Sequence, residues 1–338
     1  MEGLRCVWKP CNVVKSDMTP DSPTLPPLII GTRGSALALV QATATEDLLK
    51  AAFPEIEIVR NIIKTTGDRR TDVSLAEVAK AEGTFDKGVF IKELEQALDE
   101  GGIDIAVHSL KDLPTVLDAR FALASVLKRA PVRDVLVTRA EGGLDALPSG
   151  ARVGTSSVRR ARQVMFLRED LQVVDLRGNV PTRLQKLADG VENDAILLAE
   201  AGLVRLGFLP EFQEGDGPEE IAGMPGLFAT RLHEDVFFPA AGQGAIGLEI
   251  RAGDARSRVH AESIGDADTW TRITAEREFL RLLDAGCHTP VGVHSTLKDG
   301  QLHLRARVFP ESDGTPRTGE ATGTDPFDTA QLLFQSLS

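Results

Sequence analysis

Strand and helix signals alternate along the first two thirds of this chain. Short apolar runs are typical of strands, and segments that repeat apolar residues at helical spacing indicate helices. The apolar runs lie at residues 28–30, 56–58, 103–107, 135–138, 173–176 and 195–199, and the helical segments at 37–48, 90–98, 158–167, 180–187 and from 202 onward. This alternation predicts two α/β units with mainly parallel sheets.

The last part of the chain has a different pattern. One amphipathic helix is expected over residues 271–283, and residues 291–309 are rich in strand-forming residues. Asp299 and Gly300 form a dipeptide that favours a hairpin turn. We therefore expect a small α+β domain here. Residues 211–226, which are rich in Gly, Pro and acidic residues, are interpreted as a surface loop.

The overall charge is acidic. The 338 residues include 38 Lys or Arg and 50 Asp or Glu, which gives a net charge of −12. A general nucleic-acid binder would be basic, so no nucleic-acid partner is expected. No apolar run reaches the roughly 18 residues of a membrane helix, so no membrane association is expected either.

Three cysteines exclude a disulfide framework and indicate a reducing compartment, so we expect a cytoplasmic protein. No metal-ligand spacing is present, and no metal site is predicted. Residues 1–27 contain five prolines, no periodicity and no apolar signal core. We expect this segment to be a disordered extension, with Met18 as an alternative start.

Four polar turns follow predicted strands and open predicted helices, at residues 31–35, 155–157, 177–179 and 200–202. Such turns lie at the carboxyl ends of strands, where free N–H groups and the helix dipole favour anions. Residues 152–186 contain eight basic and three acidic residues, a local charge of +5. This clustering favours a polyanion pocket, and the alternative is a solvated helix face.

Three further segments have more than one interpretation. Residues 242–247 match G-x-G-x-x-G but lead into a strand predicted at residues 246–250, so a tight structural turn or hinge is favoured over a dinucleotide site. Asp112 stands beside Lys111 after a predicted strand, as a catalytic carboxylate would, but the segment is equally typical of a surface turn. Cys287, alone after a helix, is by its context a small buried apolar residue.

A series of motifs nevertheless resembles the hydroxymethylbilane synthases, also called porphobilinogen deaminases. The motifs stand in the family's order between residues 28 and 309. They are GTR at 31–33, TTGD at 65–68, FIKELE at 90–95, AVHSLKDLP at 106–114, VGTSSVRR at 153–160, LRGN at 176–179, the segment 239–247, TAER at 274–277 and GC at 286–287. So many motifs in series are highly specific.

The resemblance implies a fold and an activity. The fold has two type II periplasmic-binding-protein-like α/β domains that face a cleft, and a small α+β C-terminal domain. The implied boundaries are residues 28–130 with 237–262, residues 131–236 and residues 263–338. The implied enzyme is a transferase of porphyrin, tetrapyrrole and heme biosynthesis, expected to be a monomer, which joins four porphobilinogen molecules into hydroxymethylbilane and releases ammonia.

The resemblance also implies a dipyrromethane cofactor, bound covalently to Cys287, which replaces the interpretation of that residue given above. Asp112 matches the catalytic carboxylate. The residues implied to bind the cofactor are Arg33, Ser35, Lys111, Asp112, Thr155, Ser157, Arg159, Arg160, Arg177 and Gly178. Those implied to bind substrate are Arg33, Gln41, Lys87, Ser109, Arg177, Arg183 and Arg205.

Two features depart from the family pattern. Residues 82–86 lengthen the loop before Lys87, which makes the match of that lysine the weakest. Only 51 residues follow Cys287, so we expect the final helix of the third domain to be short or missing. The alternative function is a non-enzymatic module of the periplasmic-binding-protein type that binds a small anion, since the same sheet topology would serve it.

Overall fold

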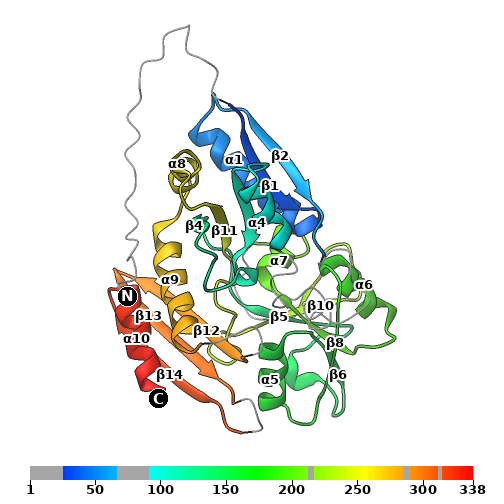
Figure 1. Cartoon of the computed structure of the whole chain (residues 1–338). Helices are drawn as coiled ribbons and strands as arrows, with labels where there is room; N and C mark the ends of the chain where they lie inside the picture. Colours follow the sequence, from blue (N-terminus) through cyan, green and yellow to red (C-terminus); the bar gives the residue numbers. More distant parts are fainter. Residues whose placement is uncertain (1–25, 67–90, 212–216, 285–288, 311–313, 338) are drawn as a thin grey trace.

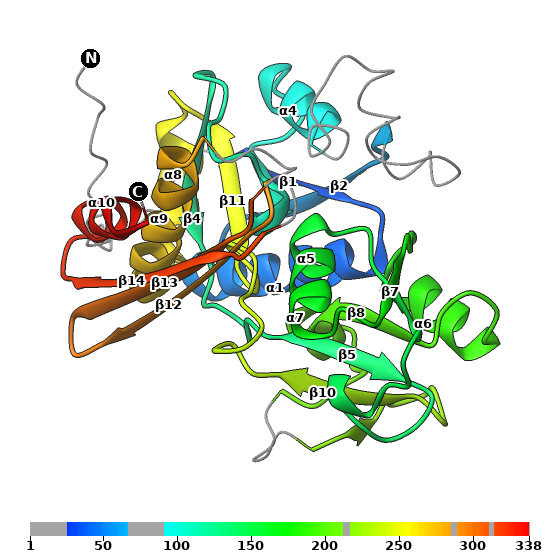
Figure 2. The ribbon, with the colours of Figure 1, turned by 90° about the horizontal axis from the view of Figure 1, so that it is seen from below.

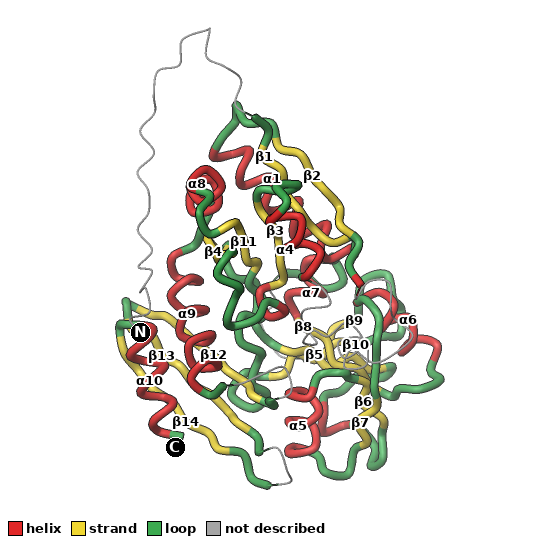
Figure 3. The backbone as a smooth tube through the Cα atoms, viewed as in Figure 1, coloured by secondary structure: helices red, strands yellow, loops and turns green. Residues whose placement is uncertain are grey.

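The computed structural model of the chain describes residues 26–66, 91–211, 217–284, 289–310 and 314–337. Within these ranges the strands form three sheets, shown in Figure 1 with the first sheet at the top, the second at the lower right and the third at the lower left. Figure 3 shows that helices flank each of them. None of the helices in the described ranges is long and apolar enough to cross a membrane.

The first sheet has the strand order β2-β1-β3-β11-β4. Its strands are β1 (Leu28–Arg33), β2 (Ile58–Ile63), β3 (Ile105–Ser109), β4 (Phe121–Val126) and β11 (Ile246–Arg251). Its helices are α1 (Ala36–Ala52), α4 (Lys92–Asp99) and α8 (Ala255–Ser263). A buried cluster that includes Leu28, Leu49 and Leu248 forms its core.

The second sheet has the order β7-β6-β8-β5-β10-β9. Its strands are β5 (Asp134–Thr138), β6 (Arg152–Gly154), β7 (Gln172–Val174), β8 (Ala195–Ala199), β9 (Glu219–Glu220) and β10 (Phe228–Leu232). Its helices are α5 (Val158–Leu167), α6 (Val180–Asp189) and α7 (Glu200–Arg205). Val135, Leu184 and Leu198 belong to its core.

The third sheet consists of β12 (Val291–Lys298), β13 (Gln301–Val308) and β14 (Arg317–Gly323). Helices α9 (Ala267–Leu282) and α10 (Pro326–Ser336) pack on each other and on these strands, as Figure 2 shows. Helix α10 has 11 residues, and Ala330 and Leu333 are buried in the core of this unit. The expectation that the final helix of the third domain is short or missing stays a prediction.

The predicted fold class is confirmed: two α/β units of the type II periplasmic-binding-protein kind precede a small α+β unit. The expected parallel character is wrong in part, because β11 runs antiparallel to β3 and β4, and β5 runs antiparallel to β8 and β10. Both β5 and β11 begin just after the chain crosses from the other sheet. They therefore arrive without the crossover helix that returns a chain to the parallel direction. The domain boundaries stay predictions.

Three of the four predicted polar turns begin helices, whereas residues 200–202 already belong to α7. Ser35, Ser157 and Asn179 are the N-caps of α1, α5 and α6, and each side chain accepts a hydrogen bond from the main chain of the first turn. Each cap follows closely on β1, β6 or β7. Because the cap leaves other N–H groups of the first turn without a helical acceptor, these ends favour anions.

Glu276 links the C-terminal unit to the two segments through which the chain crosses between the first and second sheets. Its carboxylate, which is fully buried, accepts hydrogen bonds from Arg129 Nη1 at 2.6 Å and Nη2 at 2.9 Å, and from the Gly242 amide at 2.8 Å. Ser295 Oγ also donates to it. Burial acts to raise the pKa of Glu276, but Arg129 and these hydrogen bonds lower it overall.

We predict that Glu276→Gln destabilises the protein by about 3–5 kcal/mol, because it leaves the Arg129 charge buried without a counter-charge. The midpoint of urea unfolding measures this loss. The matched control is Glu278→Gln on the same helix, whose surface pair with Arg281 is worth less than about 1 kcal/mol. Equal losses in the two variants would show that the buried pair has no special role.

Candidate active site

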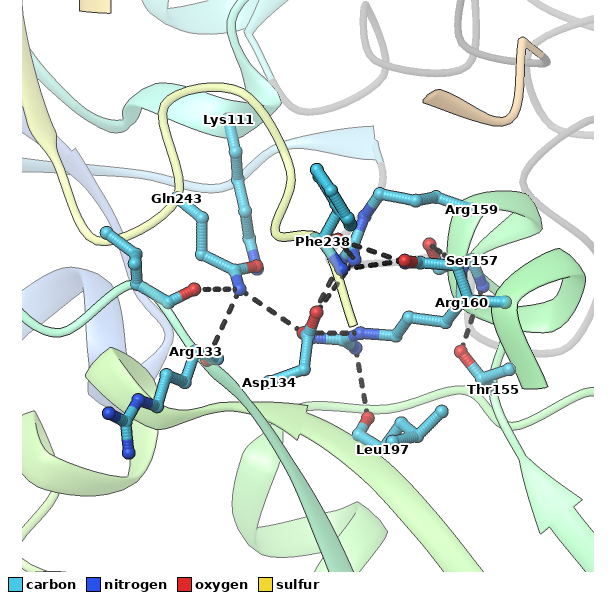
Figure 4. A network of polar contacts seen from close by, with 12 residues as sticks. Lys111, Arg133, Asp134, Thr155, Ser157, Arg159, Arg160, Leu197, Phe238 and Gln243 are labelled. Atoms are coloured by element: carbon cyan, nitrogen blue, oxygen red, sulfur yellow. Dashed lines mark hydrogen bonds and ion pairs between the residues drawn. The ribbon is translucent and has the colours of Figure 1, made fainter. Parts of the chain in front are cut away.

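Asp134, the first residue of β5, lies between two arginines. Arg160 donates to Oδ1 from Nε at 2.9 Å and from Nη2 at 2.7 Å, and Arg159 donates from Nη1 to Oδ2 at 2.7 Å. Asp134 is fully buried, and the two arginines are only 7% and 6% exposed. Figure 4 shows both guanidinium groups converging on the carboxylate. These two arginines therefore do not belong to a solvated helix face.

Gln243 connects this group to the first unit. Its Nε2 donates to the Val132 carbonyl at 2.7 Å and to Asp134 Oδ1 at 3.2 Å, and its Oε1 accepts from Lys111 Nζ at 3.3 Å. Lys111 thus lies beside the arginines of the second unit (Figure 4). Burial first, and then the neighbouring Arg160, lower the pKa of Lys111 to about 8.

Asp112 ends a short turn of 3₁₀ helix, Leu110–Asp112, which follows β3 directly. Leu110 and Leu113 are buried and anchor the turn, whereas Asp112 is partly exposed. The negative charge of Asp112 acts to raise the pKa of both Lys111 and Arg183. The Asp112 carboxylate therefore lies near cations of both α/β units. The structure therefore places Asp112 beside the cationic cluster rather than on an isolated surface turn.

The turn between β7 and α6 contributes Arg177, and the first turn of α6 contributes Arg183. Gly178 has a φ of +119°, and its carbonyl accepts from Arg183 Nε at 2.7 Å. Burial and the nearby Arg160 lower the pKa of Arg183 to about 10. Arg177 Nη1 is buried and has no hydrogen-bond partner among the described residues. A buried donor without an acceptor is costly, so this nitrogen is suited to an anionic ligand.

Gln41, Ser109, Thr155 and Arg205, which were also predicted to belong to the site, form hydrogen bonds with other protein groups. Gln41 and Ser109 bond to each other, with Gln41 Nε2 donating to Ser109 Oγ at 2.9 Å. Thr155 Oγ1 accepts from the Ser157 amide at 3.2 Å. Arg205 Nη2 donates to the Gly244 carbonyl at 2.7 Å, and burial lowers the pKa of Arg205 to about 10.

Two of the predicted site residues lie where β1 leads into α1, and two others lie outside the described residues. Ser35 caps α1, and Arg33 is the last residue of β1, next to β3 in the sheet. Within the basic run 152–186, Arg152 and Arg168 pair with Asp194 and Asp170, so the cationic site is smaller than the local charge of +5 suggests. Lys87 and Cys287 lie outside the described residues.

Asp134 and Gln243 are the two residues of the site that the sequence analysis did not identify. Asp134 opens an otherwise apolar strand, and a single acid before an apolar run is a weak signal of a buried counter-charge. Gln243 stands between Gly242 and Gly244, which have φ values of +71° and +83°. Within the segment 242–247, residues 242–244 form the tight turn and β11 begins at residue 246, so a structural turn rather than a helix start is found there.

The fold and the site together define a class: an α/β protein with two sheet-based units that brings cations from both units into one cluster. Comparison of the sequence with protein families identifies the particular family. Residues 28–259 match the model described as "Porphobilinogen deaminase, dipyromethane cofactor binding domain", and residues 270–338 match "Porphobilinogen deaminase, C-terminal domain". The chain belongs to the porphobilinogen deaminase family, whose cofactor is dipyrromethane.

Curated relatives agree with this assignment. The chain is 42% identical over 311 residues to the porphobilinogen deaminase of Desulforudis audaxviator, covering 92% of this chain and 93% of the relative. It is 45% identical over 281 residues to that of a Roseiflexus species, covering 83% and 85%. A solved regulatory domain of OxyR2 from Vibrio vulnificus shares 17% identity at a TM-score of 0.41, over 74% of this chain and 98% of that chain.

We predict that anion binding at this site weakens as the pH rises through about 8, because Lys111 then loses its charge. With a pKa near 8, about a tenth of the lysine stays charged at pH 9, so the affinity for a tricarboxylate such as citrate falls up to about tenfold from its value below pH 7. Isothermal titration between pH 7 and pH 9 measures this. Lys111→Arg keeps the charge and should flatten the profile; an unchanged slope in that variant would refute the role of Lys111.

Proposed function

We propose that this chain joins four porphobilinogen molecules head to tail into the linear tetrapyrrole hydroxymethylbilane, with release of ammonia at each joining. The enzyme is thus a transferase of tetrapyrrole, porphyrin and heme biosynthesis. Its family membership supports this activity. The observation that carries it is the meeting of Lys111, Arg159, Arg160 and Arg183 from both α/β units, because each added pyrrole brings an acetate and a propionate that need cations.

The site fits a carboxylate-bearing cofactor. Dipyrromethane, when bound, supplies the pyrrole to which the first substrate is joined. We propose that Cys287 holds it covalently and that Arg159 and Arg160 bind its carboxylates. Arg177 offers a buried Nη1 that has no partner among the described residues, which is what an incoming carboxylate would satisfy. The remaining cofactor ligands in this proposal are Arg33, Ser35, Lys111, Asp112, Thr155, Ser157 and Gly178.

Asp112 has an electrostatic task in this proposal. At each joining, a carbon–nitrogen bond of the substrate's aminomethyl group breaks, ammonia leaves, a carbon–carbon bond forms and the joined ring gives up one proton. Positive charge develops on the pyrrole as ammonia leaves, and a fixed carboxylate stabilises it. Asp112 lies at the edge of the cationic cluster, so it would place negative charge beside the pyrrole of a substrate whose carboxylates are bound by the cations.

The remaining substrate contacts follow from the same cluster. We propose that Arg33, Gln41, Lys87, Ser109, Arg177, Arg183 and Arg205 bind porphobilinogen and the growing chain. Burial of Arg183 and Arg205 lowers the pKa of each to about 10, so both stay charged at neutral pH while being largely removed from water. Desolvated cations of this kind bind carboxylates more strongly than exposed ones.

The alternative is a non-enzymatic module that binds a small anion. The cationic cluster alone would serve either function. Two features favour the enzyme: the match of residues 270–338 to the C-terminal domain of the deaminases, and Asp112 beside the cluster, which a receptor for anions would not need. Measuring ammonia and tetrapyrrole released from porphobilinogen decides between them.

We further propose that the enzyme works as a cytoplasmic monomer with no nucleic-acid or membrane partner. The net charge of −12 opposes binding to polyanionic surfaces outside the local cationic cluster. Three cysteines in 338 residues are typical of a reducing compartment.

We predict that Asp112→Asn lowers turnover at least about 100-fold with little change in thermal stability, because it keeps the shape of the side chain and removes only its charge. Steady-state release of ammonia measures the effect, with preformed cofactor supplied. Asp118→Asn is the matched control, since Asp118 pairs with Arg120 on the surface. Turnover of the Asp112 variant within a few-fold of the parent would show that its charge is not the catalytic element.

We predict that Cys287→Ser folds but lacks a covalent adduct and nearly all activity. Intact mass spectrometry of the purified protein reads the adduct, which should correspond to two linked pyrroles. Cys11→Ser serves as the control and should keep the full adduct. An adduct of parental mass on the Cys287 variant would place the attachment at another residue.

A further inference from the structure

We propose that Asp134 is a positioning residue, which fixes the guanidinium groups of Arg159 and Arg160 in the arrangement that binds the cofactor's carboxylates. This inference rests on the proposed function and deepens it. Asp134 itself is fully buried behind the two arginines and is not expected to touch substrate or cofactor.

The helix geometry explains why a positioning group is needed. Arg159 and Arg160 are consecutive residues in the first turn of α5, and consecutive side chains on an α-helix point about 100° apart. Two like charges on adjacent residues also repel each other. Asp134 overcomes both effects, because its two oxygens receive both guanidinium groups within 2.7–3.3 Å.

The hydrogen bonds leave donors for a ligand. A guanidinium group has five N–H groups. Arg159 uses three, two on Asp134 and one on the Phe238 carbonyl at 2.6 Å, and Arg160 also uses three, two on Asp134 and one on the Leu197 carbonyl at 3.0 Å. Each arginine therefore retains two N–H groups that have no partner among the described residues. Their directions are set by the bonds already made.

The charges also leave a positive excess. One carboxylate faces two guanidinium groups and the neighbouring Lys111, so the buried group keeps a net positive charge. Burial alone would raise the pKa of Asp134, but Arg159, Arg160 and Lys111 outweigh it and hold that pKa well below its usual range. Asp134 stays ionised, and the excess charge is available to an anion.

The place of Asp134 in the fold links it to both crossings between the α/β units. It is the first residue of β5, directly after the chain crosses from the first sheet. Gln243, on the returning crossing, donates to Asp134 Oδ1 at 3.2 Å and accepts from Lys111. One carboxylate thus fixes two cations directly and, through Gln243, is linked to a third from the other unit (Figure 4).

Two substitutions test this proposal. Asp134→Asn removes the charge and keeps the shape, whereas Asp134→Glu keeps the charge and moves the carboxylate by one methylene. Misplacement of about 1 Å in a site of this kind can cost about 100-fold. The parent and the variants are first prepared without cofactor, in cells that make no porphobilinogen. On incubation with porphobilinogen, we expect both variants to acquire the cofactor about 100-fold more slowly than the parent, as measured by intact mass against time.

Asp170→Asn is the matched control, because Asp170 pairs with Arg168 beyond the other end of the same helix. It should acquire cofactor at the parental rate. A thermal unfolding curve for each protein distinguishes a variant that does not fold from one that folds with its arginines misplaced. If Asp134 had only a structural role, Asp134→Asn would be less stable than the parent. The folded fraction of Asp134→Glu would then acquire cofactor at the parental rate.

Loading of either folded variant within about threefold of the parent would overturn the proposal. Failure of both variants to fold would leave Asp134 a structural role alone and would overturn it as well. The mass measurement reads cofactor loading separately from turnover. A parent that carries the adduct but releases no tetrapyrrole would refute the proposed function, while the loading rates would still decide the role of Asp134.

Discussion

Three main-chain groups in the turn at residues 242–244 are bound by side chains from three parts of the fold. The Gly242 amide donates to Glu276 of the C-terminal unit, the Gln243 carbonyl accepts from Arg129 at 2.9 Å, and the Gly244 carbonyl accepts from Arg205 of the second unit. A Cβ atom at Gly244 would lie 2.4 Å from the Ala130 carbonyl oxygen, and its φ is +83°. Only glycine fits both demands, so the packing of all three units depends on this turn.

The cations of the site are held at a cost to stability. Burial lowers the pKa of Lys111 to about 8 and that of Arg183 to about 10, which means that each charge is poorly solvated in the folded protein. A ligand that brings carboxylates relieves this cost, so part of its binding energy comes from the fold itself. Function and stability oppose each other here, as is common at preorganised sites.

Elements with strong periodicity were predictable from the sequence. The helix expected at 158–167 is α5 with the same bounds, and the Asp299-Gly300 turn joins β12 to β13 with positive φ at both residues. Strand β14 and helix α8 were missed because they carry almost no apolar pattern: β14 is an edge strand without large apolar residues, and α8 is mainly polar. Their stability comes from neighbours that the local sequence does not reveal.

Contacts that the local sequence does not reveal also limit the prediction of the site. The basic residues that follow strands could be identified because they lie in local motifs, but the contact between Asp134 and Gln243 joins residues 109 positions apart. The mixed direction of the sheets was equally hidden, since it results from the two crossings between units. Periodicity reflects only the neighbours of a residue in the sequence. The Asp134–Gln243 contact and the strand directions depend on contacts between residues that are far apart in the sequence.

The strand order also has a consequence for synthesis on the ribosome. Strand β11, at residues 246–251, lies between β3 and β4, so the first sheet remains split until the chain has been made well past the second sheet. The second sheet uses only residues 134–232 and is complete earlier. At about 5–20 residues per second, β3 and β4 wait several seconds for their shared partner. The segment made first is thus finished later than the one inserted into it, and until then the free edge of β3 and the strand β4 are exposed to wrong pairing.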